Sequence, residues 1–278
     1  MRSILLTFLF VVVVAPPQKA QAQTEIDQAF QRMYAFDFPG MNAILDAYVK
    51  VHPEDPLVYS TRAIACLFSE LQRMNILETD FFTDDDQVTD RKRLKPDPAS
   101  RDRLFQMTGE ARRRAGAILS TSPNDANAMF ALCMAAGVET DYTILVEKRY
   151  IRSFSMSRES QKYAHRLLNM TPPVMDAYLT LGMVEYVVGS MNWFFRLFVH
   201  FDQIQGSKQK AVENLQKVVS NGRYYKPLAK ILLSVIYLRN KQPAQALALL
   251  KEMERDYPEN PLIRSEVQKV SAKAPRKI

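Results

Sequence analysis

The sequence predicts an all-α fold, and three observations support this class. Glycine is scarce, with 8 residues among 278, and most of the 15 prolines stand between stretches of periodic apolar residues. Proline between such stretches ends helices, whereas a β fold needs many more turn residues. The third observation is a small residue that recurs in register through the chain. The apolar content of 47% is ordinary for a folded protein.

The first 22 residues have the features of a secretory signal peptide. Arg2 supplies a positive charge, residues 4–15 form an apolar run, and Ala20, Gln21 and Ala22 form a small-x-small cleavage site. The run is shorter than the ~20 apolar residues that cross a bilayer. We therefore expect cleavage near Ala22 and a periplasmic or secreted mature protein.

The charge of the mature chain is mildly basic. Cleavage removes Arg2 and Lys19 and no acidic residue, so the formal net charge of +7 falls by two to +5. The basic residues are spread along the predicted helices and are not interleaved with aromatic residues on one face. Single-stranded nucleic acid is bound by basic grooves with stacking aromatic residues. We therefore expect no nucleic-acid partner.

A 34-residue unit, 227–260, stands out in the C-terminal part. In its first helix the key positions hold a large, a small and an aromatic residue, which are Leu233, Ser234 and Tyr237. In its second helix they hold a small residue, an apolar residue and a late proline, which are Ala246, Leu250 and Pro258. Small residues let two helices approach closely, and the late proline stops the second helix. The unit resembles a tetratricopeptide repeat (TPR), which implies two antiparallel helices.

Four further units precede this one: 22–55, 56–125, 126–174 and 175–226. The eighth position of every unit is a small residue: Ala29, Ala63, Cys133, Gly182 and Ser234. The resemblance to TPR proteins implies an antiparallel helix-pair solenoid of about five degenerate repeats within residues 23–264. Residues 265–278 are expected to form a C-terminal helix end and a basic tail.

Three consecutive units are longer than 34 residues, and their extra residues fall between the first and second helix. The insertions lie near 75–98, 138–155 and 189–206. In a helix-pair solenoid all such turns lie along the same edge. The insertions are therefore expected to form one lobe on that edge.

The third insertion is rich in aromatic residues and supplies most of the candidate binding residues. They are Trp193, Phe194, Arg196 and Phe198, together with Tyr142 of the second insertion. Such residues fit the rim of a partner or ligand pocket. Two other interpretations stay open: the aromatic segment enlarges the core, or it makes a peripheral contact with a membrane.

Residues 176–239 are also similar to the tetratricopeptide 39 group of eukaryotic proteins. The similarity is carried by LGMVEYVVGSM, a later Gln205-Gly206, AVENLQKVV and ILLSVIYL. It implies a role at the mitochondrial surface and in inclusion-body clearance. The expected export of the chain argues against transferring that role.

Patterns typical of enzymes and metal sites are absent from the sequence. His52, His165 and His200 are far apart, and there is no glycine-rich phosphate loop or nucleophile elbow. The acidic stretch 83–90 lacks the glycine and the closing glutamate of a calcium loop. Cys66 and Cys133 are expected to be unbridged thiols inside helices. We therefore expect no catalytic residue, cofactor or metal.

Two functions fit these observations. The first is an exported scaffold that binds a protein or peptide partner of the cell envelope, with the groove of first helices as the usual binding surface. The alternative is a small-molecule or lipid-binding protein whose site lies under residues 138–155 and 189–206.

Overall fold

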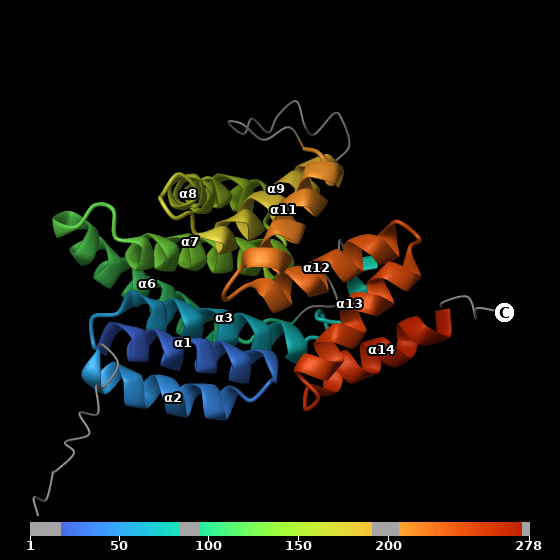
Figure 1. Ribbon diagram of the computed structural model, residues 1–278, viewed down its shortest axis with the longest axis horizontal. Helices are drawn as coiled ribbons and strands as arrows, with labels where there is room; N and C mark the ends of the chain where they lie inside the picture. The colour runs from blue at the N-terminus through green and yellow to red at the C-terminus, as the bar shows by residue number, and fades with distance from the viewer. Residues whose placement is uncertain (1–17, 84–94, 191–205, 274–278) are drawn as a thin grey trace, which may run out of the picture.

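The computed structural model describes residues 18–83, 95–190 and 206–273, and these residues form helices and no β-strand (Figure 1). The predicted all-α class is confirmed. The α-helices are α1 (Gln18–Tyr34), α2 (Phe38–Val51), α3 (Pro56–Arg73), α4 (Thr79–Thr83), α6 (Pro98–Thr121), α7 (Ala126–Asp141), α8 (Tyr150–Leu168), α9 (Tyr178–Ser190), α11 (Lys208–Asn221), α12 (Lys226–Arg239), α13 (Pro243–Asp256) and α14 (Pro261–Lys273). A π-helix, η1 (Tyr142–Val146), extends α7, and a 3-10 turn, η2 (Met175–Ala177), precedes α9.

Short polar side chains fix where many of the helices begin. Asp37, Asp55, Asp97, Asp125 and Ser207 stand at N-cap positions and accept backbone N–H groups of the first turn. A proline in the first turn follows three of these caps, where its missing N–H has no helical partner to lose. Each cap contributes about 1 kcal/mol, so local sequence sets the helix boundaries.

Consecutive long helices pack in pairs. The pairs are α1 with α2, α3 with α6, α7 with α8, α9 with α11, and α12 with α13, and α14 packs on α13. Helix α7 lies at the centre, because it also packs against α3 and α6. Among the described residues only Ala126–Val146 is long and apolar enough to cross a membrane, with mean hydropathy 1.4. Most of it (67%) is buried inside the protein, as in a core helix.

The small residues at the eighth positions of the five units are all buried: Ala29, Ala63, Cys133, Gly182 and Ser234. Ser234 Oγ lies 3.5 Å from the carbonyl oxygen of Ala246 on the paired helix. A Cβ atom at Gly182 would lie 3.1 Å from Leu215 Cγ on α11. Helices α9 and α11 therefore approach too closely there for a larger residue.

The cysteines form no disulfide, as predicted. Cys133 is buried, and its Sγ lies 3.4 Å from the carbonyl oxygen of Ser160 on α8 and 3.5 Å from Thr180 Oγ1 on α9. Burial raises the pKa of both thiols. Cys133 therefore acts as a compact packing residue between three helices.

The two ends of the described chain are held against each other. Arg223 donates to both carboxylate oxygens of Asp27 on α1, at 2.7 and 2.5 Å. The Asn260 amide donates to the carbonyl oxygen of Tyr34, at 2.8 Å. Helix α14 contacts the segment after α3, where Lys269 Nζ lies 2.6 Å from Glu78. The first unit thus packs against the last ones.

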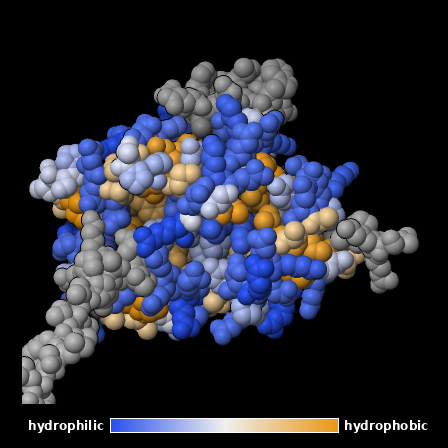
Figure 2. Space-filling view, viewed as in Figure 1, coloured by the Kyte–Doolittle hydropathy of each residue, from blue (hydrophilic) through white to orange (hydrophobic). Residues whose placement is uncertain are grey.

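The face of the molecule seen in Figure 2 is mostly hydrophilic, with apolar areas between the polar ones. Val51 is the one large hydrophobic side chain among the described residues that is exposed, at 63%. The core is correspondingly large and joins residues of nearly every helix.

We predict that Gly182→Leu lowers the free energy of unfolding by roughly 1 to 3 kcal/mol, because the new side chain meets Leu215 and the backbone of Ala211. The measurement is thermal or urea unfolding. Gly116→Leu is the matched control, since Gly116 is an exposed helix-interior glycine with no atom near its missing Cβ. That control should be neutral or stabilising. Equal melting temperatures for the two variants would contradict the prediction.

Candidate functional site

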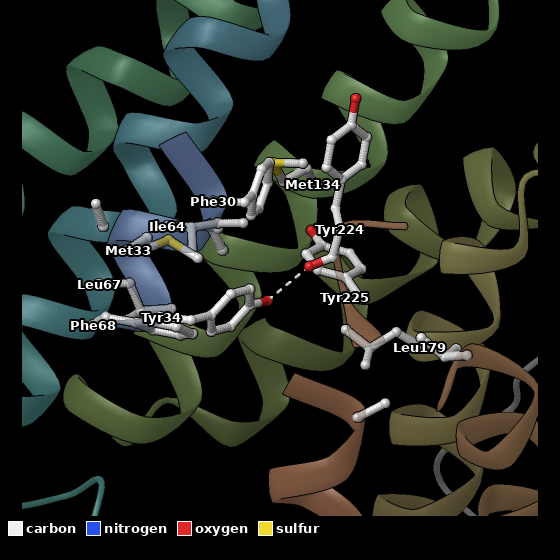
Figure 3. Close-up of a cluster of buried hydrophobic side chains, with 14 of the residues drawn as sticks. Phe30, Met33, Tyr34, Ile64, Leu67, Phe68, Met134, Leu179, Tyr224 and Tyr225 are labelled. Carbon is white, nitrogen blue, oxygen red and sulfur yellow. Dashed lines mark hydrogen bonds between the residues drawn. The ribbon is translucent and has the colours of Figure 1, made fainter. Parts of the chain in front are cut away.

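Aromatic side chains fill the centre of the molecule (Figure 3). The ring of Tyr224 stacks against Phe30 of α1 and Phe130 of α7, with centroids 4.7 and 5.6 Å apart. The dashed line in Figure 3 marks the bond in which Tyr34 Oη donates to the Tyr224 carbonyl oxygen, at 3.0 Å. These residues are buried. The inner faces of α1 and α7, where a peptide groove was expected, are therefore covered by the chain itself.

A buried carboxylate holds these tyrosines in place. Asp176 on η2 accepts the backbone N–H groups of Arg223, Tyr224 and Tyr225, at 2.9, 2.9 and 2.7 Å. Burial raises the pKa of Asp176, although the three N–H groups act against that rise. The bonds bend the chain just before α12 so that both tyrosines enter the core.

A second buried carboxylate closes the first insertion. Glu70 on α3 accepts the backbone N–H of Asp97 at 2.8 Å and two hydrogen bonds from Arg73, both at 2.8 Å. Arg73 also donates to the carbonyl oxygen of Lys95, at 2.6 Å. The chain therefore returns from residues 84–94 to a fixed point at the start of α6.

A third buried carboxylate does the same at the third insertion. Glu185 on α9 accepts the backbone N–H of Ser207, the N-cap residue of α11, at 2.7 Å. A Cβ atom at Gly189 would lie only 2.6 Å from the carbonyl oxygen of Gly206, whose φ is +70°. Glycine is required at this crossing, and the two ends of the insertion touch there.

The second insertion contains irregular backbone. The five-residue π-helix η1 ends with the Glu147 N–H donating to the Tyr142 carbonyl oxygen, at 3.1 Å, and Lys148 then has a φ of +56°. Lys148 Nζ lies 5.1 Å from the centre of the Phe81 ring in the first insertion. Glu147 pairs with Arg101 at the start of α6, at 2.9 Å. The first and second insertions are therefore joined.

We call the described parts of the three insertions the insertion edge, in which contacts join the first two insertions. Among the described residues it comprises 74–83, 95–97, 142–149, 189–190 and 206–207. Its backbone departs from regular α-helix at the π-helix and at the left-handed residues Asn75, Lys148 and Gly206. Such irregular backbone is common at functional sites. We therefore take the insertion edge as the candidate functional site.

The structure describes one of the five predicted binding residues. Tyr142 is fully buried, and its ring packs edge-to-face on Phe105 with centroids 5.8 Å apart. Burial raises its pKa to about 12. Tyr142 is therefore a core residue here and not the rim of an open pocket, because it continues the buried face of α7 that holds Met134 and Val138. Trp193, Phe194, Arg196 and Phe198 lie outside the described residues.

The two buried glutamates that bind the ends of the insertion edge were not identified from the sequence. Both interrupt largely apolar first-helix segments, Glu70 in CLFSELQ and Glu185 in LGMVEYVVG. A lone carboxylate in such a segment indicates a buried acceptor, and this signal could have revealed them. Among the described residues, no three His, Cys, Asp or Glu side chains are grouped closely enough to hold a metal ion.

Comparison with known proteins assigns the chain to no family. No model of a known protein family matches the chain, and no curated protein does either.

We predict that Glu70→Gln lowers the free energy of unfolding at pH 7 by roughly 1 to 3 kcal/mol, because the amide cannot satisfy the same three donors. Burial by itself raises the Glu70 pKa, but the bonds from Arg73 and Asp97 outweigh it and hold the pKa below the usual 4.5. The carboxylate therefore stabilises the fold above that pH. Its contribution is lost as the pH falls through the lowered pKa of the folded state.

Urea unfolding at pH values from about 7 down to about 3 checks this dependence. The difference between wild type and Glu70→Gln should shrink toward the acid end. Glu54→Gln is the control, since Glu54 is 70% exposed and its pairing with Arg114 spans 3.9 Å. It should change stability by less than about 1 kcal/mol at every pH. A difference for Glu70→Gln that stays constant with pH would refute the assigned charge state.

Proposed function

We propose that the protein is an exported scaffold of TPR-like helix pairs that binds a protein partner through its insertion edge. Three features support the repeat architecture: five packed helix pairs, a capping helix α14, and a buried small residue at the eighth position of each unit. The support for export is the signal-like sequence of residues 1–22, with periplasmic or secreted location as its consequence.

We choose the binding surface on one observation: the inner face of the helix pairs is filled by side chains of the protein itself. Repeat scaffolds commonly bind ligands on their concave surface. Here Phe30, Phe130, Tyr224 and Tyr225 pack against one another in that place and are buried. A peptide entering there would have to displace the core. The binding function is therefore assigned to another surface.

Part of the insertion edge belongs to the core, as the buried side chains of Ile76 and Tyr142 show. We assign binding to the inserted residues between its fixed ends. Glu70 and Glu185 fix the first residues of α6 and α11 from within the core. We infer that inserted residues 84–94 and 191–205, which lie between these points in the sequence, can serve another purpose. Long added segments in compact domains are usually functional or disordered.

The sequence of the third insertion supports a binding role. Residues 193–198 read Trp-Phe-Phe-Arg-Leu-Phe, and each large apolar side chain left in water forfeits roughly 1.5 to 3 kcal/mol. Aromatic and arginine side chains also dominate the energetic centres of protein interfaces. A partner that covers this sequence explains both its composition and its place in the chain.

We predict that deleting residues 83–90, with a short glycine-serine linker in their place, leaves the melting temperature nearly unchanged. The reason is that Glu70 and Arg73 hold Lys95 and Asp97 at the return point. The comparison variant is the same deletion combined with Glu70→Gln. It should lose the stability that the carboxylate provides. Unfolding of the simple deletion variant would show that the insertion is part of the core.

We predict that replacing Phe194, Phe195 and Phe198 by serine abolishes capture of a partner by the tagged protein in an extract of its own cell envelope. The measurement is an affinity pull-down with quantitative mass spectrometry. Val51→Ser is the control, because Val51 is exposed and lies at the end of α2, away from the insertion edge. That variant should retain every captured protein.

A melting curve of the triple variant separates loss of binding from loss of folding. If the variant keeps both its stability and its captured proteins, the insertion edge is not the binding site. If wild type captures no protein but the fluorescence of Trp193, the single tryptophan, shifts with apolar ligands, the site takes small molecules or lipids instead.

A further inference from the structure

A cavity of about 260 Å³ lies where the first insertion meets the C-terminal helix. One wall comes from the end of α3 and the residues that follow it, and the other comes from the first residues of α14. Its volume is just below the ~300 to 1,000 Å³ of sites that take drug-sized ligands. The cavity therefore suits a ligand of about the size of one amino-acid residue with its two flanking peptide groups.

Hydrogen bonds and ion pairs hold the two walls together. Glu266 on α14 is buried and accepts the backbone N–H of Thr79, at 3.3 Å, and the Thr79 hydroxyl. Lys269 on α14 bridges Glu266 and Glu78, at 3.0 and 2.6 Å. The walls are thus in place before a ligand arrives. A preorganised site of this kind costs a ligand little ordering entropy.

Two side-chain amides line this cavity. Gln72 and Asn75 are exposed, and neither amide has a hydrogen-bond partner in the part of the chain that the structure describes. Asn75 has a left-handed φ of +57°, a conformation in which asparagine is enriched among non-glycine residues. An amide side chain has both donors and an acceptor, as a peptide group does. Two such amides can therefore hold the main chain of an extended peptide.

The rest of the lining favours a neutral and partly apolar ligand. Glu78 is the one charged residue of the lining, and it is already paired with Lys269. A charged ligand would compete with this ion pair. Leu77, Pro261 and Leu262 supply apolar surface for a side chain. The lining thus matches an aliphatic residue between two neutral peptide groups. A free amino acid fits less well, because no unpaired charge of the lining offsets its two charged ends.

We propose that this cavity binds an aliphatic residue within an extended peptide segment of the partner. Gln72 and Asn75 bond to the peptide groups on either side of that residue. The inference rests on the function proposed above, because Asn75, Leu77 and Glu78 belong to the insertion edge. It adds the chemistry that the partner presents there, which is a neutral main chain with one small apolar side chain.

The test uses N-acetyl-leucine methylamide, a leucine whose two ends are capped as peptide groups. It is added to the isotope-labelled protein, and nuclear magnetic resonance follows the side-chain NH₂ signals of Gln72 and Asn75. Both signals should shift and saturate with a Kd on the order of 1 mM, because so small a ligand has few atoms to contribute affinity. N-acetyl-leucine methyl ester lacks one peptide N–H and should bind more weakly.

Gln72→Ala with Asn75→Gly should weaken binding at least about tenfold, as followed through the backbone signal of Leu77. Both changes are compatible with the fold, because alanine suits an exposed helix position and glycine suits the left-handed φ of Asn75. Gln268→Ala with Lys241→Gly is the matched control. It replaces an exposed amide of α14 and a residue with a φ of +58°, both outside the cavity lining. That control should bind as wild type does.

Equal binding by wild type and the cavity variant, or shifts confined to residues outside the cavity, would overturn the proposal. So would absence of a shift at about ten times the expected Kd. Equal shifts with glucose or with free leucine would overturn the ligand class. The proposed function fails separately: in that case the capped leucine binds, but wild type captures no protein in the pull-down experiment.

Discussion

The carboxylate of Asp176 determines how the two halves of this molecule meet. Three successive N–H groups at residues 223–225 converge on it, and no regular helix or strand would satisfy them in that conformation. The resulting bend directs Tyr224 and Tyr225 toward Phe30 and Phe130. Arg223 points the other way and reaches Asp27 on the first helix. One buried acceptor thus sets the contacts of the fourth unit with the first and the third.

Buried glutamates have a different role at the insertion edge. A helix that follows a long insertion ordinarily depends on the insertion for its position. Glu70 and Glu185 remove this dependence, because each binds the backbone N–H at the N-cap of the next helix. The cost of burying each carboxylate is offset by charge-assisted hydrogen bonds. The starts of α6 and α11 are therefore fixed by hydrogen bonds to the helix before each insertion.

Much of the fold follows from the sequence, because the signals are local. Aspartate caps followed by proline set the starts of α2, α3 and α6, and the small residues Gly182 and Ser234 mark close helix contacts. The filled centre could not be predicted in this way. It depends on Asp176 meeting residues 223–225, a contact between segments about 48 positions apart. Neither Asp176 nor residues 223–225 stand out in the sequence.

Part of the candidate site could likewise be predicted from the sequence, and part of it could not. Periodicity and unit length located the insertions, since they require only a count of residues between helices. The burial of Tyr142 was missed, although an α-helical register carries the buried face of Met134 and Val138 on to this residue. The pairing of Lys148 with Phe81 depends on a left-handed residue within a segment that has no glycine.

The contact between the first and last units changes how the protein loses its structure. In an open array each repeat touches only its neighbours, so the ends fray and unfolding proceeds inward step by step. Here α1 is bonded to Arg223 and Asn260, and α14 is bonded to the segment after α3. Separating either end breaks contacts of the other. Within residues 18–273, where the structure describes them, neither terminal helix is held by its neighbour alone. Folding of this part requires contacts between residues far apart in sequence, which makes it slow and cooperative.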